Sequence, residues 1–456
     1  MKNNELIAGA GGGGSGGGAG GPNVARDNLD SVQYARLLEL ISEGEIEGFP
    51  SARSYTKGTA SYDNAALKDI FFNNVPVLRE GADVTNPSDS DFNYKGIYTY
   101  LRYGTQAQDW IRGFRLSETI FNVGTVVSFA SSVTRTITDT TVDAVRITFS
   151  VPQLQFFQAD GDVTGTQVNF RVELSYDGGD FSTANGGLSS GDSRLQFKGR
   201  TADLYQRAVV IDFTQSFSSS VAVRIVRETA DAGTGDPENS TRVDEISWAA
   251  YAEIRYSKLR YPNSAVFGLV LPAEQFGSVP QRAYRIRGIK VQIPSNARPA
   301  LGPNGRGGLI YKDEPWDGTF TQSTDGGNTY GGTQWTSDPA WILWDLLTSS
   351  RYGFGDHIDT SKLDKWAFFE ASQYCSGRNT YLTDGRSGTT DDYNSQTGKH
   401  GLDDGTGTFE PRFSCNVNIQ TQEEAYKLIN DMCSVFRAMP FWSAGSLAVA
   451  QDRPTD

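Results

Sequence analysis

The stretch "VNFRVELSYDGGD", residues 168–180, decides the fold class of this chain. Its apolar residues occupy every second position, at Val168, Phe170, Val172 and Leu174. A period of two with polar partners between predicts a half-buried antiparallel strand, and the Asp-Gly-Gly run after it is typical of a turn. The same alternation recurs at residues 145–149 and 221–225. The sequence therefore predicts an inserted β-sandwich-like domain over residues 126–247.

Strand patterns continue on both sides of this domain. "LKDIFFNNVPVL", residues 67–78, places Asn73 and Asn74 between two apolar runs, which is typical of a hairpin turn. "YRIRGIKVQIP", residues 284–294, predicts one strand with a bulge at Gly288. We expect a β domain whose first part is residues 25–125 and which returns over residues 248–298.

The character of the chain changes at "PAWILWDLLTSSRYGFG", residues 339–355. Asp338 before it is a good helix N-cap, and Pro339 suits the first helical position. Trp341, Trp344 and Leu347 share one stripe, and further apolar residues widen that stripe around the helix. A substrate cleft would need a polar face, which Asp345 alone supplies, so the helix is predicted to lie in a core.

The remaining C-terminal residues predict an α+β domain over residues 336–456, after a loop at residues 299–335. Trp316 in this loop is expected to be less buried than Trp344. A second helix is expected after Asp359, and Thr421 begins a capping box ahead of a third. The inner face expected for the second helix consists of Leu363, Trp366, Ala367, Ala371 and Tyr374. The predicted fold is mainly β with this α+β C-terminal part.

Composition excludes several classes of function. The net charge of −13 gives an acidic surface, which disfavours stable nucleic-acid binding. No apolar run reaches the roughly 20 residues that span a bilayer, and no basic, apolar signal peptide begins the chain, so synthesis in a cytosol is expected. Residues 1–24 are so rich in glycine that a flexible arm is predicted. The three cysteines are expected to be buried apolar side chains, at Cys375, Cys415 and Cys433.

Candidate catalytic chemistry is sparse. The only histidines, His357 and His400, accompany no triad or zinc motif, so no catalytic residue, metal or cofactor is predicted. The acidic loops at residues 231–240 and 404–408 miss the EF-hand spacing. Glu274 in "LPAEQFGS" is the one carboxylate among apolar neighbours, a setting that can raise an acid's pKa for peptidoglycan cleavage. A turn or interface contact is the preferred interpretation of Glu274.

Short strings spread along the chain carry a family resemblance. They include "LISEGEIEGF" (40–49), "SWAAYAEI" (247–254), "YPNSAVFGL" (261–269), "RIRGIKVQIPSN" (285–296), "WDGTF" (316–320), "WILWDLLTSSRYGFG" (341–355), "EPRFSCN" (410–416), "MCSVFRAMPFW" (432–442) and "QDRPTD" (451–456). In these strings and their order, the chain resembles the N-terminal, hub-forming portion of the host-specificity J proteins. Those are the central tail-tip proteins of lambda-type phages with long, non-contractile tails. Residues 81–244 match poorly.

The resemblance implies that three copies form a ring and cone at the tail end. The β domains would then be tail-tube-like β-barrels that close the tube, anchor the tape measure protein and contact the distal tail ring and other tail tip proteins. Host-receptor binding would belong to C-terminal regions beyond these residues, and phage DNA would pass transiently during ejection. The expected location is the tail tip of the virion, after synthesis in the host cytoplasm.

Two other functions stay open, namely a tail-associated peptidoglycan-degrading enzyme and a carbohydrate-binding tail module. For the structural hub, the candidate interface lies in "YPNSAVFGLVLPAEQFG", residues 261–277. Phe276 could point outward as an anchor with Glu274 and Gln275 as rim contacts. The alternative is that Phe276 folds back into its own domain.

Overall fold

The computed structural model describes most of the chain. The described residues are 24–29, 34–184, 195–234, 236–300, 307–312, 314–376, 402–403, 409–421, 423–443 and 445–453. Residues 1–23 of the predicted flexible arm and His400 lie outside them. The chain forms two compact units, the first from Met1–Tyr34, Trp110–Leu259 and Pro272–Glu274, and the second from Ala35–Asp109, Arg260–Leu271 and Gln275–Asp456. The described fold is mainly β with helices concentrated toward the C-terminus, which confirms the predicted fold class.

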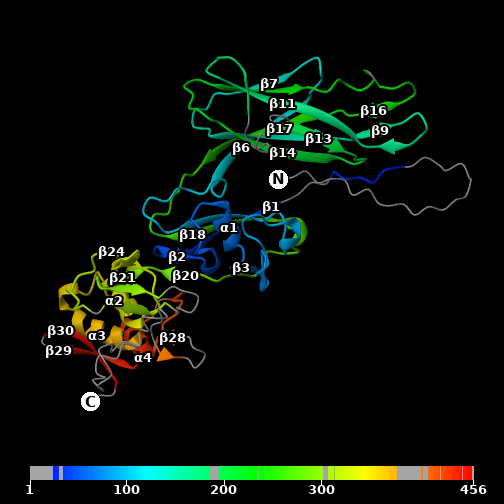
Figure 1. The fold of residues 1–456 in the computed structure, drawn as a ribbon. Coiled ribbons are helices and arrows are strands. Elements are labelled where there is room, and N and C mark those ends of the chain that lie inside the picture. The colour runs from blue at the N-terminus through cyan, green and yellow to red at the C-terminus, as the bar shows by residue number, and fades with distance from the viewer. Residues whose placement is uncertain are drawn as a thin grey trace, which may run out of the picture. The chain divides into compact units, whose positions relative to one another are not determined.

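The first unit is a sandwich of two antiparallel sheets, drawn as two layers at the top of Figure 1. One sheet has the order β14-β8-β17-β6, formed by Tyr205–Asp212, Ala144–Val151, Ser247–Tyr256 and Leu116–Val126. The other has the order β12-β11-β15-β7 with β13 also on β11, formed by Ser182–Thr183, Thr166–Tyr176, Val221–Arg227, Val133–Ile137 and Leu195–Gly199. A small sheet, β10-β9-β16, consists of Val163–Thr164, Gln155–Phe157 and Thr241–Val243.

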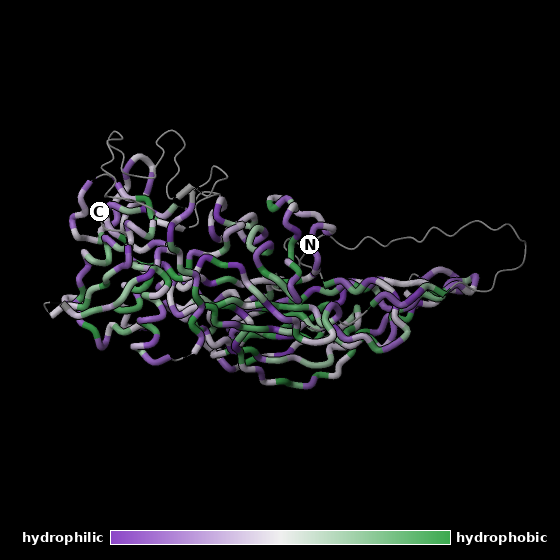
Figure 2. Tube along the Cα trace, turned by 90° about the horizontal axis from the view of Figure 1, so that it is seen from below, coloured by the Kyte–Doolittle hydropathy of each residue, from purple (hydrophilic) through white to green (hydrophobic). Residues whose placement is uncertain are grey.

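The sandwich core follows from the period-two pattern. Along its strands, hydrophobic and hydrophilic positions follow one another closely in Figure 2. The inward residues of both sheets meet in one cluster, where Phe149 of β8 packs 5.6 Å from Phe170 of β11 between ring centroids. The alternating residues predicted for β8, β11 and β15 are buried, as expected. The sandwich strands run from Leu116 to Tyr256, which corrects the predicted span of 126–247, because the edge strand β6 is too exposed to alternate clearly.

Residues 24–29 pack onto this sandwich. The Ala25 N–H donates to the Val163 carbonyl at 2.9 Å, and the Arg200 Nη1 donates to the Ala25 carbonyl at 2.7 Å. Asn28 Oδ1 accepts from the Arg200 N–H at 2.7 Å. The neighbouring Gly199 has a φ of +146°, and a Cβ there would lie 2.3 Å from Asn28 Oδ1. Only glycine therefore allows this segment to approach so closely.

The N-terminal part of the second unit surrounds helix α1 (Ala60–Ala66) with three small sheets. They are β1-β18-β5 (Tyr34–Ser42, Ala265–Pro272, Tyr98–Tyr103), β19-β3-β4 (Arg282–Tyr284, Ile70–Phe72, Val75–Pro76) and β2-β20 (Ile46–Gly48, Arg287–Ile289). The predicted hairpin is present, with Asn73 and Asn74 at positive φ between β3 and β4. These sheets are open, and no closed barrel is found among the described residues.

The stretch at residues 284–294 corrects a prediction. It forms the end of β19, β20 and β21 (Val291–Ile293) rather than one bulged strand. Each piece pairs with a different partner, because β19 pairs with β3, β20 with β2 and β21 with β26 (Gly332–Gln334). A segment that pairs with strands of three different sheets must bend between them. The apolar pattern of the segment does not show which strands these are.

The C-terminal part of the second unit has three helices around one core. They are α2 (Pro339–Thr348), α3 (Lys365–Cys375) and α4 (Ala425–Val435). Short hairpins accompany them: β22-β23 (Ala297–Pro299, Leu309–Tyr311), β24-β25 (Ser323–Asp325, Asn328–Tyr330), β27-β28 (Leu402–Asp403, Phe409–Glu410) and β29-β30 (Ala438–Ser443, Ser446–Gln451). Four of these short strands, β22 to β25, lie within the predicted loop of residues 299–335 or overlap its start, and so does β26. The sequence did not predict them because three-residue strands leave little periodicity.

Helix α2 is buried as predicted. Asp338 caps it, Pro339 opens it, and Trp341 is 0% and Trp344 3% exposed. Trp316 is also only 4% exposed, against the prediction, because it packs between Trp341 and Phe369. A tryptophan in a polar loop thus anchors that loop to the core.

The other two helices begin later than predicted. Helix α3 starts at Lys365, after a short 3-10 turn at Thr360–Lys362, so its buried residues are Phe368, Ala371, Ser372 and Cys375. Trp366, predicted to face inward, is 48% exposed. Helix α4 starts at Ala425 with no side-chain cap, so the predicted capping box at Thr421 does not form. In the described part of the chain, no helix is long and apolar enough to cross a membrane.

Candidate interface, arginine network and ligand pocket

The predicted interface residues lie on a short 3-10 turn, Ala273–Gln275, and the residue after it. Glu274 is exposed. The Gln275 side chain makes two hydrogen bonds to the backbone of Lys95. The Lys95 N–H donates to Gln275 Oε1 at 2.9 Å, and Gln275 Nε2 donates to the Lys95 carbonyl. The Phe276 ring is half-buried and stacks on Tyr94, with centroids 5.2 Å apart. Phe276 thus packs against its own unit. Glu274 is the residue of the three whose side chain is most available for a contact with another chain. The interface itself stays a prediction.

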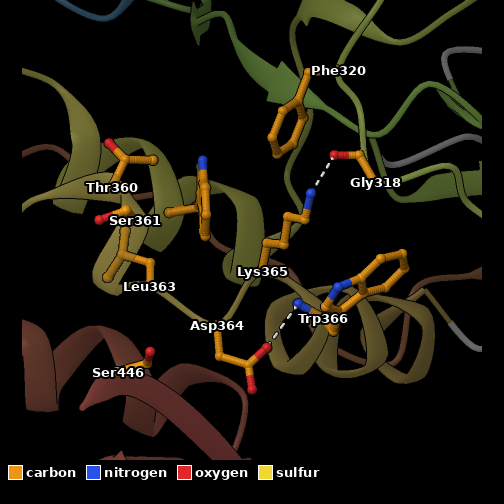
Figure 3. Close-up of a pocket in the computed structure, with 10 residues that line it drawn as sticks. Gly318, Phe320, Thr360, Ser361, Leu363, Asp364, Lys365, Trp366 and Ser446 are labelled. Carbon is orange, nitrogen blue, oxygen red and sulfur yellow. Dashed lines mark hydrogen bonds between the residues drawn. The ribbon is translucent and has the colours of Figure 1, made fainter. Parts of the chain in front are cut away.

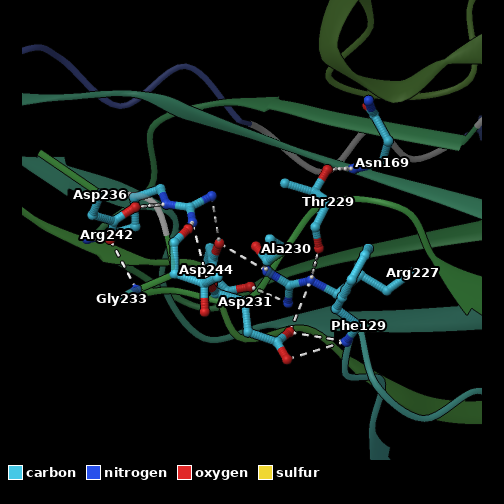
Figure 4. Close-up of polar contacts among 11 residues, drawn as sticks. Phe129, Asn169, Arg227, Thr229, Ala230, Asp231, Gly233, Asp236, Arg242 and Asp244 are labelled. Carbon is cyan, nitrogen blue, oxygen red and sulfur yellow. Dashed lines mark hydrogen bonds and ion pairs between the residues drawn. The ribbon is translucent and has the colours of Figure 1, made fainter.

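An arginine network joins the end of β15 to β16 and to the segment after β6 (Figure 4). The buried side chains of Arg227 and Asp244 form an ion pair, with 2.8 Å between Arg227 Nη2 and Asp244 Oδ2. The geometry of this pair is not that of a hydrogen bond. Arg227 also donates to the Asp244 and Thr229 carbonyls, at 3.0 and 2.8 Å. Arg242 pairs with Asp236, and Asp231 accepts from the Phe129 N–H at 3.0 Å. The carboxylates are therefore committed to holding loop 228–240, and a buried pair of this kind is costly to break.

The predicted cap of α2, Asp338, is a buried carboxyl of the second unit, only 1% exposed. Asp338 Oδ1 accepts from the N–H groups of Ala340 and Trp341, at 3.0 and 3.2 Å. Its Oδ2 accepts from the hydroxyls of Ser372 and Ser376, at 2.7 and 3.3 Å. Burial raises the pKa of Asp338 to about 6, although these four donors act in the opposite direction. All four donors belong to the fold, so Asp338 joins α2 to α3 and is not a free acid.

Other residues with possible chemistry are dispersed. His357 is exposed on the turn after α2. The cysteines are free and buried, as predicted, and burial raises the pKa of the Cys433 thiol to about 12. Within the described ranges, no three His, Cys, Asp or Glu side chains gather as metal ligands would.

A pocket that the sequence did not predict lies between four segments of the second unit (Figure 3). It has a volume of about 610 Å³. Its walls come from α2, the 3-10 turn with the start of α3, the segment around Phe320, and the start of β30. Exposed Trp366 contributes to it because α3 begins at Lys365 rather than earlier. Pocket residues from such distant parts of a chain leave no local motif.

Comparison with known proteins shows which proteins this chain resembles. Residues 117–257 match the model of the FNIII-A domain of tip attachment protein J. The chain is 30% identical over 436 residues to the tip attachment protein J of Escherichia phage SECphi27, and 26% identical over 433 residues to that of Escherichia phage SECphi4. Each match covers 95% of this chain, but only 30% and 31% of the relatives' length.

A match to infectious bursal virus derived T=1 particles has a TM-score of 0.12 at 13% identity, which carries no argument. The FNIII-A match coincides with the sandwich strands, which run from Leu116 to Tyr256. The chain is therefore similar to tip attachment protein J over nearly all of its own length, and its residues 117–257 match the FNIII-A domain model.

Proposed function

We propose that this chain is a structural component of the phage tail tip, where three copies form a ring that closes the tail tube. The observation that carries the proposal is the match to tip attachment protein J across 95% of the chain. The fold supports it, because the carboxylates of the arginine network and of the α2 cap are paired within the fold rather than free for catalysis. A part that assembles needs rigid modules, and buried networks of this kind provide them.

The charge of the chain suits a conduit for DNA. A net charge of −13 repels the phosphate backbone, so DNA could slide past the ring during ejection without binding to it. We further propose that the ring contacts the tape measure protein, the distal tail ring and other tail tip proteins. In the longer relatives, regions that this chain does not match would then bind the host receptor.

The turn with Glu274, Gln275 and Phe276 is proposed as part of the contact between copies. Its inward Phe276 and its two bonds to Lys95 hold the turn in one shape. A pre-shaped turn loses little entropy on association, and exposed Glu274 would then act as a rim contact.

Mass photometry of the purified chain, with cross-linking of intact virions, tests the three-fold assembly. We expect a species of three chains of 49.7 kDa each. A chain that stays monomeric, and that cross-links in virions only to other proteins, would remove the ring from the proposal. A peptidoglycan dye-release assay separates the enzymatic alternative, since release abolished by Glu274→Gln would favour that alternative.

A further inference from the structure

The pocket between α2, α3 and β30 has a donor that the protein does not use. Trp344 lines this pocket and is 3% exposed. The other core tryptophans direct their indole N–H to a protein oxygen, as Trp341 does to Tyr311 Oη at 3.1 Å and Trp316 to the Thr319 carbonyl at 2.6 Å. Among the described residues, the Trp344 Nε1–H donates to none. The Trp344 Nε1 is not sealed from solvent by the protein, so its N–H is open to the pocket, where a ligand acceptor is the expected partner.

A second wall of the pocket is an open aromatic face. Trp366 is 48% exposed at the start of α3. Lys365 beside it donates to the Gly318 carbonyl at 2.7 Å, and its ammonium lies 5.5 Å from the Trp366 ring and 5.6 Å from the Trp316 ring (Figure 3). Trp316 packs 5.0 Å from Trp366 between centroids. The Trp366 ring is therefore supported from within while its outer surface stays free.

The polar groups of the pocket provide both an acceptor and hydroxyls. Asp364 Oδ1 caps α3 by accepting from the Trp366 and Ala367 N–H groups, at 3.1 and 3.3 Å. No hydrogen bond to its other carboxylate oxygen is found within the described ranges. The hydroxyls of Thr360, Ser361 and Ser446 also line the pocket. A ligand would thus meet one N–H donor, one carboxylate acceptor and several hydroxyls around an aromatic face.

This combination selects one class of ligand. An anion such as phosphate would meet the Asp364 carboxylate, and the nearby Lys365 already serves Gly318. A purely apolar ligand would bury the Trp344 N–H and the carboxylate without partners. A pyranose ring has an apolar C–H face for an aromatic ring, and its hydroxyls both donate and accept hydrogen bonds. A volume of about 610 Å³ is within the usual range for small-molecule sites.

We propose that this pocket is a saccharide subsite. A pyranose ring stacks on Trp366, one ring substituent accepts a hydrogen bond from Trp344 Nε1, and a hydroxyl donates to the free oxygen of Asp364. The subsite does not depend on the assembly proposed above, since all of these residues belong to one chain.

Saturation-transfer NMR on the full chain tests the subsite with three defined probes: the β-1,4-linked N-acetylglucosamine trimer, cellotriose and maltotriose. We expect saturable binding of at least one trisaccharide. Trp366→Ala should weaken that binding roughly tenfold through lost stacking. Trp344→Phe, which keeps an aromatic ring but removes the N–H together with part of the ring volume, should weaken it about three- to tenfold. The matched control is Trp442→Ala, because Trp442 is 70% exposed and does not line the pocket.

Several results would overturn the proposal. One is the absence of saturable binding for all three probes up to their solubility limits. Another is equal loss of binding in Trp366→Ala and Trp442→Ala, and a third is unchanged binding in Trp344→Phe. Thermal melts of each variant show whether it folds, and an exposed position such as Trp366 should leave the melting temperature near that of the unaltered chain. If Trp366 is instead protected only in the trimer, the pocket holds a neighbouring copy rather than a sugar.

Discussion

Replacing Asp345 with asparagine should stabilise the C-terminal part of the chain at neutral pH. Asp345 lies half-buried on α2, and its Oδ2 accepts a hydrogen bond from the Tyr352 hydroxyl. Burial raises the pKa of Asp345 from 3.8 to about 6, and the Tyr352 bond only partly opposes this rise. Asparagine keeps an oxygen for Tyr352 but carries no charge that burial could penalise.

The magnitude follows from linkage between protonation and folding. A carboxyl whose folded pKa is raised contributes stability below its unfolded pKa, and this contribution is lost as pH rises through the folded pKa. For Asp345, this contribution to stability is lost between pH 3.8 and about pH 6. At about 1.4 kcal/mol for each pKa unit, the ceiling is about 3 kcal/mol. Because Asp345 is only half-buried, we expect Asp345→Asn to gain about 1–3 kcal/mol at neutral pH and almost nothing at about pH 4.

Denaturant unfolding followed by tryptophan fluorescence measures this difference, since the aromatic cluster around α2 reports on the region. Asp338 titrates in the same direction, but it is present in both proteins and cancels from the comparison. A stability difference that is equal at both pH values would refute the assignment of the cost to the buried charge. A loss of stability at neutral pH would show that the carboxylate is needed by Tyr352.

Four further substitutions probe the fold and the interface. Asp338→Ala leaves four donors without their acceptor, so we expect a loss of about 2–4 kcal/mol in unfolding free energy by denaturant titration. Trp344→Ala and Trp316→Ala should each cost about 3–5 kcal/mol in the same measurement, and a much smaller cost at Trp316 would contradict its burial. Phe276→Ala should lower the melting temperature of the monomer because its ring packs on Tyr94. A variant with an unchanged melting temperature but lost incorporation into virions would instead place the Phe276 ring at an interface.

The alternation of apolar and polar residues predicted the strands that bury one of their two faces. The sandwich strands around Phe149 and Phe170 were identified because every second residue enters the core. The edge strand β6 was missed because both of its faces are largely exposed. Helix α2 was identified through its cap and its apolar stripe, since both signals are local in the sequence.

The wrong predictions concern residues whose burial depends on where a helix begins or on contacts with residues far away in the sequence. Moving the start of α3 to Lys365 turns Trp366 from a core residue into a pocket wall. The burial of Trp316 depends on Trp341 and Phe369, far along the chain. The direction of Phe276 was left open by the sequence for the same reason, because Tyr94 is its partner. Such contacts follow from tertiary packing, which no short window of sequence contains.

The position of the chain in the virion tests the central proposal most directly. Phage particles whose copy of this chain carries an epitope tag can be labelled with gold-conjugated antibody and imaged by electron microscopy, with untagged particles as the control. The account predicts gold at the distal end of the tail, and a three-fold ring containing this chain in a cryo-EM map of that end. Gold on the capsid or along the tail shaft, or a chain absent from purified particles, would contradict the account.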